Sequence, residues 1–359
     1  MEKTLTSCEV SKDLLVNIIN NIEYNKIIID YYKELEKEVF GPKKEIITKK
    51  IEYIRDCNKY WDIDKYKIQK VKDFKRTNLC KDKFCSNCKK VKQSARMAKY
   101  LPELEKYKNI SYHLTLTAPT VEGEYLEDRI NLMSQSFRKL INYISGKKRI
   151  KGINFEWGYK GAIRSLEITF KGNIFHPHYH CLLLLDGFKM SEKVIINDYS
   201  FSYGEYKNSF SEEEILIQKI WYLLINGKTV NKKNIDSLDI GYSCKLDKLK
   251  PNDYNELFKY MTKEIQEDGQ VLTYNQFKTL YFALYRVKQI QGYGILYNVT
   301  DEGDIESFIE EYNNIIEKLK EIENPERILE KPSELLKDKE YILISRKSYF
   351  KYLRELEED

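Results

Sequence analysis

The sequence has no run of about 18 apolar residues, the length that a membrane-spanning helix needs. Its first residues also lack the apolar stretch of a secretory signal peptide. These absences exclude a membrane helix and predict a cytoplasmic protein with no membrane partner. Hydrophobic residues nevertheless make up 42% of the 359 residues, which is normal for a folded chain. We therefore expect a globular protein with one large core or two ordinary domains.

A cytoplasmic protein keeps its cysteines reduced, so its clustered cysteines indicate a metal site sooner than disulfides. Of the seven cysteines, Cys80, Cys85 and Cys88 form a compact cluster that ends in a C-x-x-C pair. Cys57 is the candidate for the fourth ligand of a tetrahedral structural zinc site. Its distance along the chain does not by itself fix that role.

The net charge is only +5, but the charges are unevenly distributed. Lysine and arginine outnumber the acids in 41–100, and the acids outnumber them in 301–359. A lysine-rich segment with interleaved aromatic residues can hold phosphates by charge and stack on unpaired bases. The basic segment is thus a candidate for DNA binding, and a solvated lysine-rich surface is the alternative.

Hydrophobic periodicity predicts an α+β fold, with a central antiparallel sheet, flanking helices and helical termini. The cysteine cluster adds a zinc-knuckle segment to this fold. A strand is expected at 111–120, and the strand-like runs 162–170 and 178–185 should form a hairpin across the turn-like KGNIFHP. The predicted helices are 11–40 (one or two), 124–144, 212–224, 252–269, one within 271–300 before a turn at QGYG, and acidic helix from 301 onward. Four regions follow: helical 1–50, basic and cysteine-rich 51–105, a main α+β domain 106–300 and the acidic helical 301–359.

Histidine is scarce: the chain has four, and three of them lie in the sequence HPHYH. Residues two apart on a strand point to one face, so His178 and His180 can present two imidazoles to one ion. Glu167, on the preceding strand-like run, should lie about level with this pair. Two histidines and one carboxylate suit Mn²⁺ or Mg²⁺ with open coordination positions. His176 competes as third ligand, although Pro177 can turn the chain there, and a purely structural histidine cluster is the alternative.

The helix expected at 252–269 carries a second set of reactive side chains. At 100° per residue, Glu256, Tyr260 and Lys263 share one face, opposite an apolar face that can pack on the core. A tyrosine hydroxyl can attack a phosphodiester if a metal ion and a cation stabilise the developing charge, and Lys263 can supply that cation. Because the chain has 29 tyrosines, this spacing alone does not identify Tyr260 as a nucleophile.

Together these segments resemble the plasmid rolling-circle replication initiators of low-G+C Gram-positive bacteria, within the HUH endonuclease superfamily. The resemblance covers roughly 75–300 and depends on the order and spacing of NLCKDKFCSNCKK, LTLTAPTVEGEYLEDRINLMSQSFRKLI, RSLEITFKGNIFHPHYHCLLLL and ELFKYMTK, and more weakly on QGYG. It implies that 106–300 is an HUH-type endonuclease domain. It also implies a site-specific DNA nicking and strand-transfer enzyme.

The resemblance further implies roles for individual residues. Tyr260 would attack the scissile phosphate of the origin, leaving a 5′-phosphotyrosyl link and a 3′-OH that primes synthesis. His178 and His180 would be the metal-binding pair. Replicators with two tyrosines carry the second one helical turn before the nucleophile, where this chain has Glu256, and a carboxylate there can act as a general base on water at termination. Partners would be origin DNA, single-stranded or in a hairpin at the nick site, and a host helicase and other replication proteins.

His113 departs from the family pattern, since an apolar aromatic residue is expected at its position. It is either a satisfied strand histidine or a further group of the metal shell. Three other functions compete with nicking for replication. They are a relaxase or single-strand transposase of the same chemistry, a zinc-dependent DNA-binding repressor without catalysis, and a metal-dependent hydrolase that uses water without a covalent step.

Overall fold

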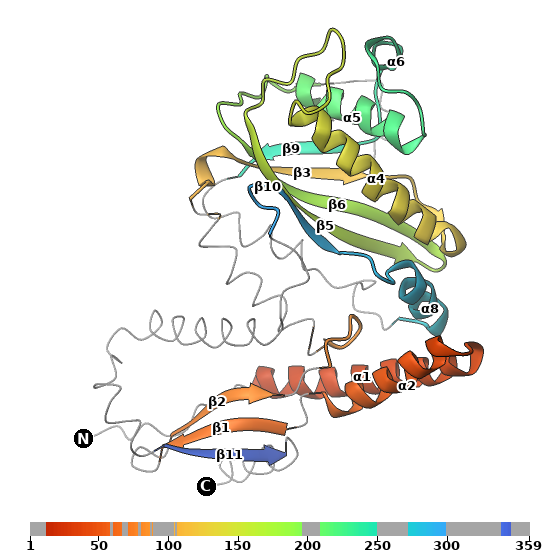
Figure 1. The fold of residues 1–359 in the computed structure, drawn as a ribbon, viewed down its shortest axis with the longest axis vertical. Coiled ribbons are helices and arrows are strands. Elements are labelled where there is room, and N and C mark those ends of the chain that lie inside the picture. Colours follow the sequence, from red (N-terminus) through yellow and green to blue (C-terminus); the bar gives the residue numbers. More distant parts are fainter. Residues whose placement is uncertain are drawn as a thin grey trace. The chain divides into compact units, whose positions relative to one another are not determined.

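The computed structural model describes residues 12–57, 60–66, 71–77, 80–86, 88, 104, 106–195, 209–249, 272–298 and 339–345. They belong to two compact units, one formed by residues 1–99 with 303–359 and the other by residues 100–302. Each unit contains its own β-sheet (Figure 1). Among the residues named, no helix is both long enough and apolar enough to cross a bilayer.

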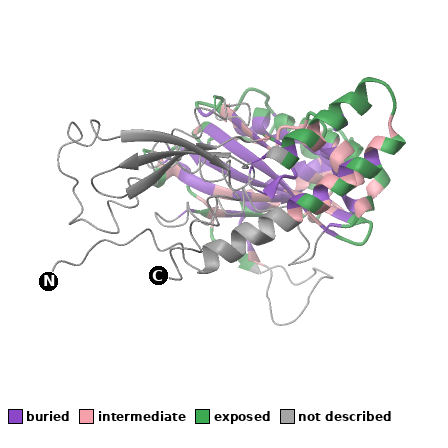
Figure 2. Cartoon of the chain, turned by 90° about the horizontal axis from the view of Figure 1, so that it is seen from below, coloured by how far each residue is buried: buried purple, intermediate pink, exposed green. Residues whose placement is uncertain are grey.

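A six-stranded antiparallel sheet forms the centre of the second unit (Figure 1). Its main path runs in the order β10 (Ile290–Gly294), β5 (Tyr159–Lys171), β6 (Ile174–Leu185), β3 (Ser111–Thr117) and β9 (Cys244–Lys248), and the short β4 (Val121–Glu122) pairs with the start of β6. All of these pairings are antiparallel. Figure 2 shows most of this sheet buried. The predicted α+β fold with a central antiparallel sheet is confirmed.

Two amphipathic helices cover one face of this sheet. Helix α4 (Leu126–Ile144) buries apolar residues three or four positions apart, which places them on one side of the helix: Leu126, Ile130, Met133, Phe137, Leu140, Ile141 and Ile144. Helix α5 (Glu212–Ile225) begins at a capping box formed by Ser211 and Glu214. Phe137 of α4 and Trp221 of α5 both pack against Tyr179 of β6, with ring centroids 5.5 and 6.4 Å apart. The alternate residues of β6, including His178 and His180, therefore point to the opposite face.

The β5–β6 hairpin was predicted, but its turn is much shorter than expected. Only Gly172 and Asn173 separate the strands, and Gly172 has a positive φ of 59° that suits a tight turn. Pro177 consequently lies inside β6, opposite Ile168. The N–H of Leu166 donates to the backbone O of Gln289, the residue that precedes β10 on the other side of β5. Alternate residues of a strand direct their backbone groups to the same side, so Ile168 also directs its N–H away from β6, and the backbone N of Pro177 points away from β5. Pro177 then lies beside the gap between β3 and β4. Its missing N–H therefore removes no hydrogen bond from a neighbouring strand.

QGYG, expected as a turn, is also part of a strand. It lies in β10, whose Gly292 pairs with Ile163 of β5. Gly294 ends the strand with a positive φ of 62°, and a turn follows at 295–298. A Cβ at Gly294 would also lie only 2.3 Å from the backbone O of Lys160, so the two strands approach too closely there for a side chain. The other elements of this unit are η1 (Lys108–Ile110), η2 (Gly123–Tyr125), β7 (Val194–Ile195), β8 (Ser209–Phe210), α6 (Lys232–Asp236) and α8 (Tyr274–Ala283). The helix predicted at 252–269 lies outside the described residues.

The first unit combines two helices with a three-stranded sheet. Helices α1 (Lys12–Glu38) and α2 (Pro42–Asp56) are separated at Gly41, which has a φ of 62°. The sheet order is β11 (Lys339–Ser345), β1 (Tyr60–Tyr66) and β2 (Val71–Thr77), all antiparallel. Helix was expected at 339–345; this part of the prediction was wrong, because the apolar run YILI there pairs with β1 across a very long sequence separation.

Candidate metal centres

Three predicted metal ligands meet on the face of the large sheet that α4 and α5 leave uncovered. In the β5–β6 register Glu167 lies directly opposite His178, and Ser165 lies opposite His180. The Oε2 atom of Glu167 is 2.5 Å from His178 Nε2 and 2.7 Å from His180 Nε2. Donor atoms of all three residues lie within 4.8 Å of one another. Two imidazoles and one carboxylate so arranged fit one divalent metal ion, with room for further ligands.

Burial and hydrogen bonding set the charge of this group. Glu167 is 5% exposed, and burial alone would raise the pKa of its carboxyl. Hydrogen bonds from His178 and His180 outweigh that effect and hold the pKa of Glu167 well below its usual range. The carboxylate is therefore ionised at neutral pH, which is the form that a cation binds.

His176, the competing third ligand, holds a different position. Its ring centroid is 5.5 Å from that of His178, and its backbone O is 3.3 Å from His178 Nδ1. Among the described residues, the donor set within 4.8 Å contains Glu167 and does not contain His176. The geometry thus favours Glu167 as the third donor, with the backbone of His176 placed behind His178.

His113, the residue that departs from the family pattern, contacts His180 on the side of the His180 ring that faces away from Glu167. Its Nε2 atom is 3.2 Å from His180 Nδ1, and the two rings are stacked with centroids 5.4 Å apart. Burial, with a further effect of His180, lowers the pKa of His113 to about 4. His113 therefore belongs to the surroundings of the site as a neutral ring that contacts a proposed ligand.

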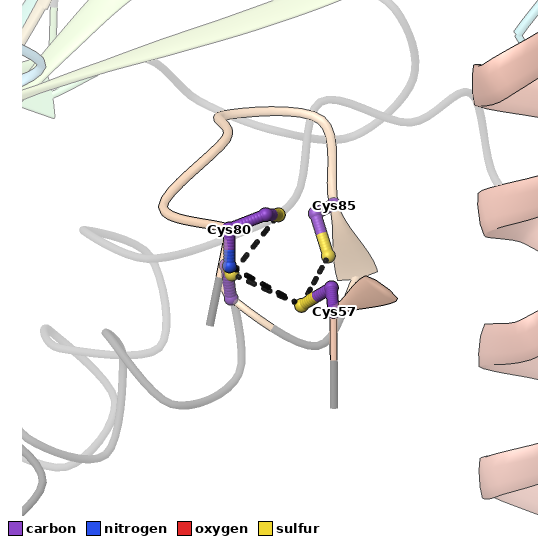
Figure 3. A group of neighbouring side chains, drawn as sticks. Cys57, Cys80 and Cys85 are labelled. Carbon is purple, nitrogen blue, oxygen red and sulfur yellow. Dashed lines mark hydrogen bonds between the residues drawn. The ribbon is translucent and has the colours of Figure 1, made fainter. Parts of the chain in front are cut away.

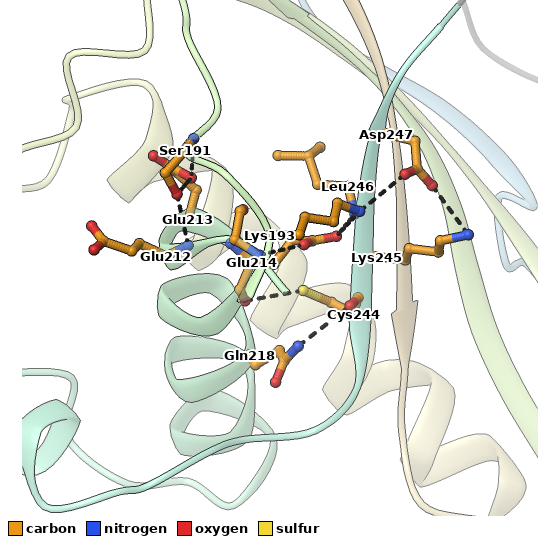
Figure 4. Close-up of polar contacts among 11 residues, drawn as sticks. Ser191, Lys193, Glu212, Glu213, Glu214, Gln218, Cys244, Lys245, Leu246 and Asp247 are labelled. Atoms are coloured by element: carbon orange, nitrogen blue, oxygen red, sulfur yellow. Dashed lines mark hydrogen bonds and ion pairs between the residues drawn. The ribbon is translucent and has the colours of Figure 1, made fainter. Parts of the chain in front are cut away.

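An ionic network around the buried Glu214 joins strand β9 to helix α5 and to the loop after β6 (Figure 4). Lys193 Nζ is 3.1 Å from both Glu214 Oε1 and Asp247 Oδ1, and the N–H of Leu246 donates to Glu214 Oε1 at 2.7 Å. Glu214 is fully buried and also caps α5. Asp247 lies opposite His113 in the β3–β9 register. This network was not predicted from the sequence, where the Ser-x-x-Glu capping motif at 211–214 is its one visible signal.

The four predicted zinc ligands also come together, in the other unit. Figure 3 labels three of them, Cys57, Cys80 and Cys85. Their Sγ atoms are 3.6 Å apart for Cys57 and Cys88, 3.4 Å for Cys80 and Cys88, and 3.5 Å for Cys85 and Cys57. Tetrahedral zinc with Zn–S bonds of about 2.3 Å requires sulfur separations of about 3.8 Å. Hydrogen bonds from the neighbouring thiols, that of Cys57 first, lower the pKa of Cys85 well below its usual range. The cluster, including the distant Cys57, thus fits a tetrahedral thiolate site.

Helices α1 and α2 anchor this cysteine cluster through polar contacts. The side chain of Asn25 donates to Cys85 Sγ at 3.4 Å and accepts from the backbone N–H of Ser86 at 3.1 Å. Tyr32 donates its hydroxyl to Asp82 at 2.9 Å, and Lys50 forms an ion pair with the same buried carboxylate. None of these anchors was predicted, because each joins residues at least 32 positions apart and no spacing motif marks them.

The predicted nucleophile and its helix neighbours lie outside the described residues. This applies to Tyr260, Glu256 and Lys263. Their roles stay predictions.

The fold and its side chains define a protein with an antiparallel sheet that presents a two-histidine, one-carboxylate set, and with a separate four-cysteine site. A family model described as "Replication protein" matches residues 71–334. The chain belongs to this replication protein family, and the predicted resemblance is confirmed.

Individual relatives agree. A "Protein rep" of Staphylococcus aureus is 30% identical over 171 residues, 45% of this chain and 70% of the relative. A "Protein rep" of Streptococcus pneumoniae serotype 2 is 29% identical over 230 residues, 61% of each chain. A third, from Bacillus amyloliquefaciens, is 27% identical over 164 residues, and the matched part is 44% of each chain. No solved structure matches this chain.

Proposed function

We propose that this protein initiates rolling-circle replication of a plasmid by nicking one strand at the origin, with the hydroxyl of Tyr260 as nucleophile. One observation carries the proposal: Glu167 joins His178 and His180 on one face of an antiparallel sheet, in a chain of the replication protein family. A sheet that offers two imidazoles and a carboxylate to one ion suits phosphodiester chemistry, in which charge develops on phosphate oxygens.

A divalent ion such as Mn²⁺ or Mg²⁺, held by Glu167, His178 and His180, would act as a Lewis acid toward the scissile phosphate. The oxygen of Tyr260 forms a bond to phosphorus, and the bond from phosphorus to the 3′-oxygen breaks. The proton lost by the tyrosine is balanced by the proton that the new 3′-OH gains. Lys263 stabilises the charge on the phosphate, and the free 3′-OH serves as the primer.

Glu256 terminates the reaction. One helical turn before the nucleophile, its carboxylate acts as a general base on water when the regenerated junction is cut. Hydrolysis then takes the place of a second tyrosine attack, and the enzyme is released after one round of synthesis. This role distinguishes a replication initiator from a relaxase of the same chemistry.

The four cysteines are proposed to hold a structural zinc ion that braces the basic segment of the first unit. Lysines of that segment, including Lys81 and Lys83, contact DNA phosphates. The DNA is single-stranded or extruded as a hairpin at the nick site. A host helicase unwinds the duplex, and other host replication proteins extend the strand from the 3′-OH.

The test is a denaturing gel. Wild-type protein, Tyr260→Phe and the control Tyr254→Phe are incubated with Mn²⁺ and with supercoiled or single-stranded DNA that carries the candidate origin. We expect a metal-dependent protein–DNA adduct with wild type and the control, and none with Tyr260→Phe. Cleavage without an adduct would show water as the nucleophile. Binding of a verified origin without cleavage would favour the repressor.

A further inference from the structure

Both proposed histidine ligands have a hydrogen-bond partner on the side of the ring that faces away from Glu167. His178 Nδ1 is 3.3 Å from the backbone O of His176. His180 Nδ1 is 3.2 Å from His113 Nε2. The partner of His178 is a backbone oxygen, which any residue at position 176 would supply. The partner of His180 is the side chain of His113, at a position where the family pattern leads us to expect an apolar aromatic residue.

The sheet register explains how His113 reaches His180. Thr115 of β3 lies directly opposite His180 of β6, so His113, two residues earlier on β3, is a diagonal neighbour on the same face. Aromatic side chains can span this diagonal distance. The two rings are stacked at an interplanar angle of 24°. His180 is 7% exposed, so its orientation is set by protein groups more than by solvent.

The surroundings of His113 keep it in place. Leu182 of β6 and Asp247 of β9 lie opposite His113 in the two ladders that flank β3. Asp247 is held in turn by Lys193, which is itself paired with the fully buried Glu214. The loop after β6, helix α5 and strand β9 are thereby tied together around the strand that carries His113.

We propose that His113 is a positioning residue for the metal centre, which holds the His180 ring so that Nε2 faces the ion. This inference depends on the proposed function, because it assumes that His180 binds a metal ion. A histidine that binds metal through one nitrogen usually donates the N–H of the other to a partner, and this bond fixes both tautomer and ring orientation. In the metal-bound protein, His180 therefore donates its Nδ1–H to His113 Nε2, and His113 carries its own proton on Nδ1.

The choice of residue follows from the donor and acceptor inventory. Neutral imidazole offers one acceptor nitrogen, which the Nδ1–H of His180 requires. Phenylalanine keeps a planar aromatic ring, somewhat larger than imidazole, but offers no acceptor, whereas glutamine offers an amide oxygen at similar reach. His113→Phe should thus loosen the His180 ring, and His113→Gln should restore much of its restraint.

The first test measures Mn²⁺ affinity of the full-length, zinc-loaded protein by the loss of the free Mn²⁺ signal in electron paramagnetic resonance. Outer partners of metal ligands typically contribute 10- to 100-fold to affinity. We expect His113→Phe to weaken Mn²⁺ binding about tenfold or more, and His113→Gln to lie within about threefold of wild type. Lys171→Gln, an exposed residue at the end of β5 on the face that carries Glu167, is the control and should bind as wild type does.

The second test observes the hydrogen bond itself. With only four histidines in the chain, the ring nitrogens can be assigned by single substitutions in long-range ¹H–¹⁵N spectra of the protein saturated with diamagnetic Zn²⁺. We expect His180 as one Nδ1–H tautomer with a slowly exchanging proton, and rapid exchange of that proton in His113→Phe. Melting temperatures without Mn²⁺ identify any variant that fails to fold.

The outcomes separate this inference from the proposed function. If His180→Ala abolishes Mn²⁺ binding while His113→Phe and His113→Gln both retain wild-type affinity and slow exchange, the metal centre stands and the positioning role is wrong. If Mn²⁺ affinity is indifferent to His178→Ala and His180→Ala, both ideas fail together. If His113→Phe misfolds, His113→Leu replaces it in the same comparison.

Discussion

Glu167 and His178 lie directly opposite each other in the β5–β6 hairpin, with Oε2 and Nε2 2.5 Å apart. This relationship distinguishes Glu167 from His176, which shares a strand and a face with His178 but stands outside the donor set. A metal ion replaces the hydrogen bonds that now hold the group together, so binding competes with protons for the same nitrogens.

Glu167→Gln should therefore weaken Mn²⁺ binding much more than His176→Gln. The amide keeps the size of the side chain but removes the negative charge, and we expect a loss of at least about tenfold. His176→Gln leaves the backbone O in place and should change affinity less than about threefold. Titration by isothermal calorimetry measures both, and the reverse ranking would make His176 the third ligand.

Removal of zinc should destabilise the first unit specifically. Cys85→Ser removes one of four thiolates, and the metal content, measured by atomic emission, should fall from one zinc per chain toward none. Cys8→Ser, which changes a cysteine far in sequence from Cys57, Cys80, Cys85 and Cys88, is the control and should retain its zinc. A chelator should lower the melting temperature of wild type toward that of Cys85→Ser; no response to the chelator would contradict a structural metal.

Asp82→Asn tests the link between the cysteine cluster and the helices. It removes the charge that Tyr32 and Lys50 contact, and we expect a loss of about 1–3 kcal/mol in the free energy of unfolding, measured with urea. Asp30→Asn is the matched control, since its pair with Lys33 is exposed on both sides and should contribute less than about 0.5 kcal/mol. Equal effects of the two substitutions would argue against an anchoring role.

Stability of the metal-free protein should depend on pH through His113. Burial lowers its pKa to about 4 in the folded protein, against about 6.5 in an unfolded chain. The unfolded chain binds the extra proton first, so this contribution is fully present above about pH 6.5 and is lost as the pH falls toward 4. The decline in urea midpoint over this range should be shallower for His113→Gln; parallel curves would show that His113 titrates normally.

Glu214→Gln should disturb β9 and α5 together, because one buried carboxylate serves both. It accepts from Lys193 and from the backbone N–H of Leu246, and the loss of its charge leaves Lys193 with Asp247 alone. We expect about 2–4 kcal/mol less stability. The nearby Glu212→Gln, an exposed first-turn residue, should stay within about 1 kcal/mol of wild type. A similar urea midpoint for both would contradict the importance of the network.

Period-two alternation and the hairpin pattern were sufficient to predict that Glu167, His178 and His180 lie level with one another, because both effects are local. The length of the turn was not predicted, since Pro177 was read by its general preference and the interval between β3 and β4 that tolerates it is a tertiary feature. QGYG was only partly predicted: its residues pair with β5 as a strand, and the turn follows at 295–298 after Gly294, whose φ is 62°.

Long-range contacts were beyond any spacing rule. Asn25 reaches Cys85 and Ser86 across about 60 residues, and nothing local to α1 marks it as an anchor. Cys57, the distant member of the cysteine cluster, was within reach of prediction only because thiol chemistry limits the candidates. His113 was visible as an unusual residue, but its role depends on the diagonal register of β3 and β6, which single-sequence patterns do not fix.

The pairing of β11 with β1 has a consequence for the order in which the chain acquires its structure. Strand β1 is the middle strand of its sheet, and its partner at 339–345 leaves the ribosome after all of residues 100–302. During synthesis the second unit can fold first. Until β11 has been synthesised, the edge of β1 that pairs with β11 stays unpaired. An unpaired strand edge is a site of aggregation, so a chain that ends before residue 339 should be recovered mainly as insoluble protein, even though all of the proposed metal ligands precede the cut.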